Sequence, residues 1–172
     1  MSAINMSRRQ FLKTTGIVGG GLVIGFSMTG CSSSELPITL AQQGFVPNAF
    51  LQITPDNGIR FYCPRDEMGQ GVTTGLSTLI GEELDVHPKD MEILFAGVHS
   101  DYNNPDFGVQ GTGGSSSLKA HYLQLRQVGA NTRGLLVAAA AQDLGVTASV
   151  ISTRDGHIVV AGKQYPYGQF VQ

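Results

Sequence analysis

Tryptophan is absent from the sequence, cysteine occurs only twice in 172 residues, and charged residues make up only 14% of the chain. The two cysteines, Cys31 and Cys63, are far apart, and neither lies in a CxxC pair or a His/Cys cluster. This pattern argues against a zinc or iron–sulfur site within the chain. The net charge of −2 supplies no basic patch, so we predict no nucleic-acid partner.

Glycine is abundant, with 23 residues, while charge is scarce. A surface with so few charges is poorly solvated unless something covers it. The composition therefore favours a subunit or a piece of a larger protein over a free monomer. The length that remains after an N-terminal targeting segment is enough for one domain of ordinary size.

The N-terminus carries the pattern Ser7-Arg8-Arg9-Gln10-Phe11-Leu12-Lys13, followed by a glycine-rich apolar run from Thr14 to Gly30. Paired arginines before a weakly hydrophobic run are typical of a twin-arginine export signal. We therefore expect the twin-arginine translocase as a partner and the periplasm as the destination. The alternative is a basic amphipathic start to a cytoplasmic protein.

The apolar run ends at Ser27-Met28-Thr29-Gly30-Cys31, which resembles a lipoprotein processing site with Cys31 as the acylated residue. Three outcomes stay open: lipidation of Cys31, cleavage by an ordinary signal peptidase, or an uncleaved signal that serves as an anchor. The run is short and broken by glycine for a membrane span, which needs about 20 apolar residues. We divide the chain into a signal (1–31), a linker (32–48) and a domain (49–172).

Alternating and helical spacing of apolar residues predicts an α+β fold, with short β-hairpins and a strand packed against two helices. The elements expected are a hairpin of Ala49–Ile53 with Ile59–Cys63, a helix Val72–Leu84, a strand Met91–Ala96, a helix from about Ser116 to Leu144, a hairpin of Val146–Thr153 with His157–Ala161, and a further helix start at Tyr167.

The long helix should bury an apolar face, and its two glycines indicate close helix packing. The residues expected on this face are Leu118, Tyr122, Leu125, Val128, Leu135, Leu136, Ala139 and Ala140, and the glycines are Gly129 and Gly134.

Two glycine-bearing stretches lead into the predicted helices. The first glycine loop is Glu67-Met68-Gly69-Gln70-Gly71, and the second is Thr112-Gly113-Gly114-Ser115-Ser116-Ser117. The first amides of a helix have no partner inside the helix and carry partial positive charge. Glycines let a ligand approach the backbone, and the glutamine and serines add uncharged donors. The two loops therefore predict a shared binding place for a phosphate or pyrophosphate.

Other polar residues have simpler interpretations. We interpret Glu82 and Glu83 as a solvated helix face, Cys63 as a half-buried small apolar residue and His87 as a surface loop residue. The long loop from Gly97 to Gly111 is a candidate functional loop. Its residues His99, Asp101 and Asp106 have no metal-ligand spacing, so we predict no metal site. Arg126 and Arg133 either reach phosphates or lie on a solvated face.

With both loops and Glu82-Glu83-Leu84 in view, the chain resembles the molybdenum hydroxylases. More narrowly, it resembles the large subunit of the isoquinoline 1-oxidoreductase and membrane-bound aldehyde dehydrogenase group, over essentially its whole length. The resemblance implies an oxidoreductase that binds molybdopterin cytosine dinucleotide and hydroxylates aldehydes or N-heteroaromatics with oxygen from water. The implied cofactor contacts are Met68, Gly69, Gln70, Thr112, Gly114, Ser115 and Ser117.

The resemblance also implies partner subunits, and it implies that this chain alone lacks the catalytic residue. Electrons would leave through a small iron–sulfur subunit, with a cytochrome as a candidate acceptor. Family members are several times longer, and their catalytic glutamate lies near the far end. We therefore expect an amino-terminal fragment that is inactive without the remainder of the large subunit, and we assign no catalytic role to Glu67, Glu82 or Glu83. The competing hypothesis is a small exported, lipoprotein-like binding module without catalysis.

Overall fold

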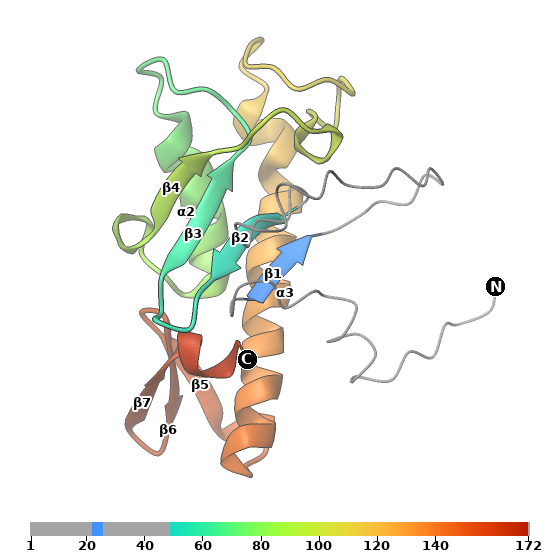
Figure 1. Cartoon of the computed structure of the whole chain (residues 1–172). Helices are drawn as coiled ribbons and strands as arrows, with labels where there is room; N and C mark the ends of the chain where they lie inside the picture. The colour runs from blue at the N-terminus through green and yellow to red at the C-terminus, as the bar shows by residue number, and fades with distance from the viewer. Residues whose placement is uncertain (1–21, 26–48, 172) are drawn as a thin grey trace, which may run out of the picture.

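The computed structural model describes residues 22–25 and 49–171, which form two small sheets arranged along one long helix (Figure 1). The strands are β1 (Leu22–Gly25), β2 (Ala49–Ile53), β3 (Ile59–Cys63), β4 (Glu92–Phe95), β5 (Ile151–Arg154), β6 (His157–Val160) and β7 (Lys163–Pro166). The α-helices are α2 (Val72–Leu84) and α3 (Ser117–Leu144), and the 3-10 helices are η2 (Pro88–Asp90), η3 (Ser100–Tyr102), η4 (Ala148–Val150) and η5 (Tyr167–Phe170).

The first sheet has the strand order β1-β2-β3-β4. β1, β2 and β3 pair in antiparallel fashion, whereas β4 runs parallel to β3 and is reached through α2. The β2–β3 turn places Asn57 at φ 66°, a left-handed conformation that asparagine tolerates, as predicted for this hairpin. The β3–α2–β4 path brings the end of β3 directly to the first glycine loop.

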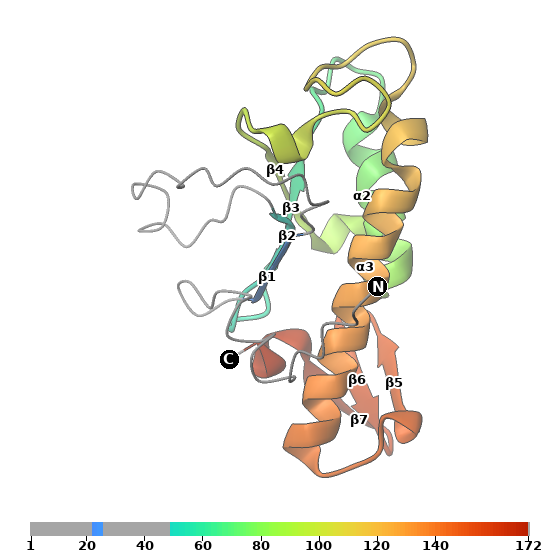
Figure 2. The ribbon, with the colours of Figure 1, turned by 90° about the vertical axis from the view of Figure 1, so that its right-hand side faces the viewer.

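The two α-helices lie side by side on one face of this sheet (Figure 2). Gly129 of α3 makes the close approach possible, because a Cβ at this position would lie 2.6 Å from the carbonyl oxygen of Ile80 on α2. The core between the layers includes the fully buried Phe61 and Leu76. The predicted close packing at Gly129 is therefore confirmed, whereas Gly134 has open space around it and marks no contact.

The predicted apolar face of α3 is wrong at its first turns. Leu118 and Tyr122 are 45% and 44% exposed, and His121 is fully buried between their positions. Leu118 lies in the first turn of α3, where its side chain packs against the backbone of Gly75 on α2. The Tyr122 ring and hydroxyl instead contact Arg126. Farther along the helix Leu125, Val128, Leu136 and Ala140 are buried as expected, whereas Leu135 and Ala139 are only half-buried.

The second sheet, in the order β5-β6-β7, packs beside the C-terminal half of α3 (Figures 1 and 2). The predicted hairpin is confirmed for His157–Val160, but its first strand begins at Ile151, because the preceding residues form η4. β7 was not predicted. It is reached through a two-residue turn in which Ala161 and Gly162 both have positive φ.

The segment Tyr167–Phe170, expected to start a helix, forms η5 and joins the two halves of the structure. The buried Tyr167 hydroxyl donates a hydrogen bond of 2.9 Å to the carbonyl of Leu84. The α+β class is confirmed. The signal residues Arg8 and Arg9, the lipidation candidate Cys31 and the linker lie outside the described residues. Among the residues that are described, no helix is long and apolar enough to cross a membrane.

Candidate functional site

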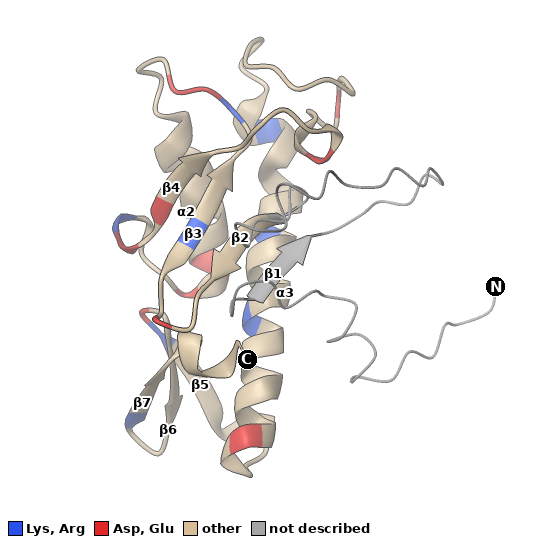
Figure 3. Cartoon of the chain, viewed as in Figure 1, with Lys and Arg blue, Asp and Glu red and all other residues tan. Residues whose placement is uncertain are grey.

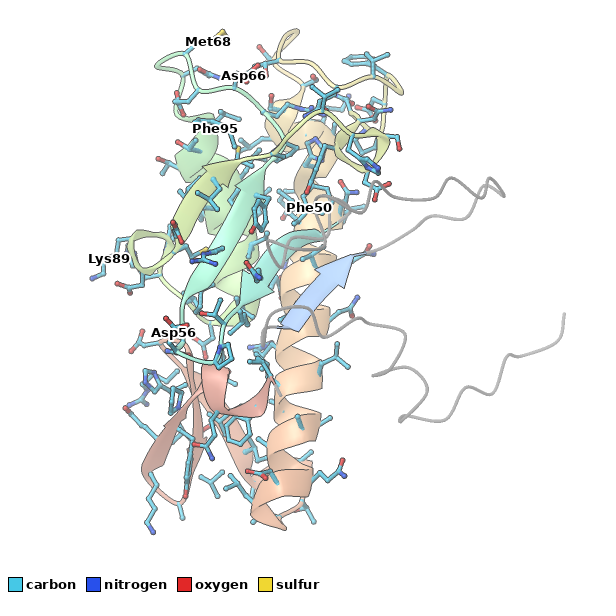
Figure 4. All side chains as sticks on the ribbon, viewed as in Figure 1. Phe50, Asp56, Asp66, Met68, Lys89 and Phe95 are labelled. Carbon is cyan, nitrogen blue, oxygen red and sulfur yellow. The ribbon has the colours of Figure 1, made fainter. Side chains whose placement is uncertain are left out.

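The two glycine loops meet at one end of the structure, beyond the starts of α2 and α3 (Figure 4). Between them lies a groove of about 400 Å³, called here the interloop groove. Its lining residues are Met68, Gln70, Val72, Thr112, Gly113, Ser115, Ser117 and Leu118. All are uncharged, and the volume falls within the range of small-molecule sites. The predicted meeting of the two loops is therefore confirmed.

A direct hydrogen bond holds the loops together. The backbone N–H of Asp66 donates to the hydroxyl of Thr112 over 2.9 Å, across 46 residues of sequence. Thr112 Oγ1 accepts this hydrogen bond, and the bond holds the two walls of the groove at a fixed separation. Its own hydroxyl proton remains to be donated, because a threonine hydroxyl is both donor and acceptor.

The first glycine loop is folded around the carboxylate of Glu67. Oε1 accepts from the N–H groups of Gly69 and Gly71, each over 2.9 Å. Oε2 accepts from Thr73 twice, from N–H over 3.0 Å and from the hydroxyl over 2.8 Å. These donors, chiefly the N–H of Thr73 and then that of Gly71, lower the pKa of Glu67 to about 2.

This arrangement corrects the expectation of open amides at the start of α2. The amides of Gly69, Gly71 and Thr73 are already bound by a side chain of the same loop. We expected the helix amides to be free because the general rule for a helix start leaves them unpaired, and Glu67 was not considered as their acceptor. The spacing of a glutamate before two glycines and a threonine was the signal for this internal cap.

Gln70 does donate and accept, but within its own loop. Its Oε1 accepts from Met68 N–H over 2.6 Å, and its Nε2 donates to the Asp66 carbonyl over 2.7 Å. Met68, at the loop tip, exposes 70% of its surface (Figure 4). The exposed thioether of Met68 and the hydrogen-bonded side chain of Gln70 together form part of one groove wall.

The start of α3 differs from that of α2. Its N-cap residue, Ser116, makes no side-chain cap of the helix. The Ser116 hydroxyl instead donates to the Gly113 carbonyl and accepts from the buried Asn104 amide. Ser115 is exposed and has φ 52°, which turns the loop sharply before the helix. The serine hydroxyls and the uncapped helix start together form the polar side of the groove.

Five of the seven predicted contact residues line the groove, namely Met68, Gln70, Thr112, Ser115 and Ser117. The other two, Gly69 and Gly114, lie in the same loops with φ of 91° and 60°, and they shape the backbone. Val72, Gly113 and Leu118 are lining residues that were not predicted. Leu118 was missed because its helical spacing indicated a core position. Binding of a ligand by the predicted residues stays a prediction.

The other polar residues also have their places. Arg126 is exposed, as expected for a solvated face, and its Nε donates to Oε1 of Glu83 on α2 over 2.7 Å. The long loop is ordered by its own bonds, including Asn104 N–H to the Val109 carbonyl at 2.8 Å. His99 accepts from the Asp101 N–H. Within the described residues, no group of three or more His, Cys, Asp and Glu could hold a metal ion.

Charged residues are sparse over the described part of the chain (Figure 3). Arg65 is 2% exposed and donates through Nη1 to the carbonyls of Pro64 and Tyr102. Among the described residues its Nε and Nη2 have no partner, and neither has Nε2 of His121. Burial lowers the pKa of both groups. Cys63 is 1% exposed and thus more deeply buried than the predicted half-buried position, and burial raises the pKa of its thiol.

A family model described as "Molybdopterin cofactor-binding domain" matches residues 3–172. Two characterised proteins align with nearly the whole chain. The membrane-bound aldehyde dehydrogenase [pyrroloquinoline-quinone] of Gluconacetobacter polyoxogenes is 30% identical over 97% of this chain and 21% of its own length. The isoquinoline 1-oxidoreductase subunit beta of Brevundimonas diminuta is 28% identical over 98% of this chain and 22% of its own length. The chain therefore spans about a fifth of these relatives.

Two solved structures share the fold. They are quinoline 2-oxidoreductase from Pseudomonas putida 86, with 19% identity, and a Cu,Mo-CO dehydrogenase, with 20% identity. Each has a TM-score of 0.51 and covers 70% of this chain and 15% of its own. At this identity the likeness concerns the fold alone.

Proposed function

The chain belongs to the molybdopterin cofactor-binding domain family, and on this premise we propose that the interloop groove holds the dinucleotide part of a molybdopterin cofactor. The observation that carries the proposal is the hydrogen bond between Asp66 and Thr112, because it brings two loops far apart in sequence to opposite walls of one groove.

The donor set of the groove fits a pyrophosphate with attached sugars. Ser115, Ser117 and Thr112 offer hydroxyls, and the uncapped start of α3 offers partial positive charge. The wall formed by Val72, Met68 and Leu118 is apolar, which suits the flat faces of ring systems. Since uncharged donors satisfy phosphate oxygens without a counter-ion, the low charge of the groove is compatible with this ligand.

We infer that the cofactor carries cytosine and that the complete protein oxidises aldehydes or N-heteroaromatics with oxygen from water. The names of the two characterised relatives support these substrate classes. When bound, the cofactor would supply the redox chemistry, while Met68, Gln70 and the serines of this chain would hold and orient it. An iron–sulfur subunit and the remainder of the large subunit are the partners we propose.

We further propose that the chain is exported with its cofactor through the twin-arginine route to the periplasm. The Arg8-Arg9 pattern supports this route. If the cofactor is inserted before export, the protein must cross the membrane already folded. The twin-arginine translocase, to which the signal directs the chain, transports folded proteins. Lipidation at Cys31 or an uncleaved signal would then hold the protein at the membrane.

The test uses the complete large subunit with Gln70→Ala. The change removes the two hydrogen bonds that the Gln70 side chain makes in the first glycine loop, together with its part of the groove wall, so we expect a lower molybdenum content and a proportional loss of activity. Molybdenum is measured by mass spectrometry of the purified protein, and cytidine nucleotide is measured after acid hydrolysis.

The matched control is Gln142→Ala, an exposed glutamine near the other end of α3. It should keep the wild-type metal content. Full molybdenum loading in Gln70→Ala would contradict the placement of the cofactor. Recovery of pyrroloquinoline quinone in place of molybdenum from the wild-type protein would overturn the proposal altogether.

A further inference from the structure

We propose that Glu67 is a positioning residue of the interloop groove: its carboxylate acts as a built-in anion that shapes the first glycine loop and excludes a ligand's anionic group from the start of α2. This inference deepens the proposed function, on which its ligand-dependent part rests. It assigns a role to a residue that does not itself line the groove.

The geometry of the carboxylate carries the inference. Its two oxygens accept four hydrogen bonds, and the donors lie two, four and six residues ahead in the chain. The backbone must curl around the carboxylate to make these contacts. Gly69 and Gly71 allow the curl, with φ of 91° and 77°, a region that disfavours other residues. The loop is therefore folded around an anion that belongs to the chain itself.

The electrostatic consequence concerns α2. An unpartnered helix start attracts anions through its amides and its dipole. Here the Thr73 amide and hydroxyl and the Gly71 amide are bound to Glu67, whose pKa of about 2 keeps it ionised at neutral pH. Asp66, which is exposed on the same loop, adds further negative charge nearby. A phosphate brought to this helix end would meet repulsion and would find these amides bound.

The same curl sets the groove wall. The amides of Gly69, Gly71 and Thr73 are bound to Glu67, while Met68 and Gln70 of the same loop line the groove. Gln70 completes the loop by bonding Met68 N–H and the Asp66 carbonyl. The loop therefore has two sides, a carboxylate side that bonds the backbone and a groove side that presents uncharged side chains.

The experiment compares the 172-residue wild-type chain with Glu67→Gln by NMR, with Glu82→Gln as the control. Glu82 is an exposed carboxylate on α2, so its replacement changes the net charge equally. Without ligand, we expect amide hydrogen exchange at Gly69, Gly71 and Thr73 to accelerate by about tenfold or more in Glu67→Gln, because charge-assisted hydrogen bonds are lost. The exchange of the buried Ile80 amide in α2 should stay unchanged.

The second measurement is a titration with inorganic pyrophosphate. In the wild type and in Glu82→Gln, the amides of Gly69, Gly71 and Thr73 should not shift. In Glu67→Gln they should shift, because the helix end has become available. A merely structural cap would change exchange but would not change where the anion binds.

Three outcomes would overturn the inference: shifts at Gly71 and Thr73 in the wild type on addition of pyrophosphate, no shift of these amides in Glu67→Gln, or unchanged amide exchange in Glu67→Gln. Should Glu67→Gln fail to fold, the wild-type titration still decides the exclusion. Glu67→Asp, which keeps the charge but is shorter by one methylene, then supplies the exchange comparison and should accelerate exchange at Thr73 most. Because exchange is measured without ligand, a failure of the cofactor proposal in Gln70→Ala remains distinguishable from a failure of this one.

Discussion

Replacing Gly129 with alanine tests the close contact between α2 and α3, the two helices that follow the glycine loops. The new Cβ would lie 2.6 Å from the Ile80 carbonyl oxygen and 2.9 Å from Cβ of Glu83, both on α2. Contacts this short force α2 to move, because a backbone carbonyl cannot swing aside as a flexible side chain can. Overpacking of a well-packed interface costs about 1–3 kcal/mol.

Gly134→Ala on the same helix is the matched control, because its new Cβ would have no atom within 4 Å apart from the adjacent backbone of α3 itself. Both substitutions gain about 1 kcal/mol in helix propensity, so this contribution cancels in the comparison. We expect Gly129→Ala to be about 1–3 kcal/mol less stable than Gly134→Ala, and Gly134→Ala to be more stable than the wild type.

The free energies of unfolding come from urea denaturation of the 172-residue chain, followed by far-ultraviolet circular dichroism. The m-values should agree among the three proteins, so that a change in midpoint reports stability. Equal stability of the two variants would refute the reasoning, because it would mean that α2 and α3 are not in tight contact at Gly129.

Two further predictions concern the alkaline range and export. Burial raises the pKa of Tyr167 to about 12, from an ordinary value of 10.0, so the stability gained by keeping this phenol protonated is complete below pH 10 and is lost as pH rises from about 10 to about 12. Tyr167→Phe should therefore lose less stability than the wild type over that range in urea titrations, while at neutral pH it should cost about 1–3 kcal/mol because the Leu84 carbonyl loses its buried donor. For export, Arg8→Lys combined with Arg9→Lys should retain the chain in the cytoplasm on cell fractionation, and unchanged periplasmic accumulation would contradict the twin-arginine proposal. The intact mass of the exported wild-type chain distinguishes a lipidated Cys31 from simple cleavage and from an uncleaved signal.

Local patterns were sufficient for most of the secondary structure. The hairpin around Asn57, the helix Val72–Leu84 and the long helix ending at Leu144 follow from short-range spacing and turn chemistry, and the structure agrees within a residue or two. β7 was missed because its residues Lys163–Pro166 have no alternating apolar pattern. The strand is held by pairing with β6, a contact that local spacing does not encode.

For the site, the residue types and the two loops could be predicted, but their hydrogen bonding could not. Glu67 and Gln70 were recognised as polar groups beside glycines, yet which donors each would bind depends on the curl of the backbone. Nothing in the sequence around Arg65 indicated that its side chain would be buried. Its burial results from the packing of the Tyr102 loop over the end of β3.

The amino-acid sequence by itself determined the elements, the two glycine loops and the family resemblance, because helix spacing, turn residues and short motifs are properties of neighbouring residues. Only the tertiary structure decided that the two glycine loops face each other across one groove, and that Leu118 lines this groove and is not part of the core. These outcomes depend on which groups meet across the fold, through Gly129 against Ile80 and Asp66 against Thr112.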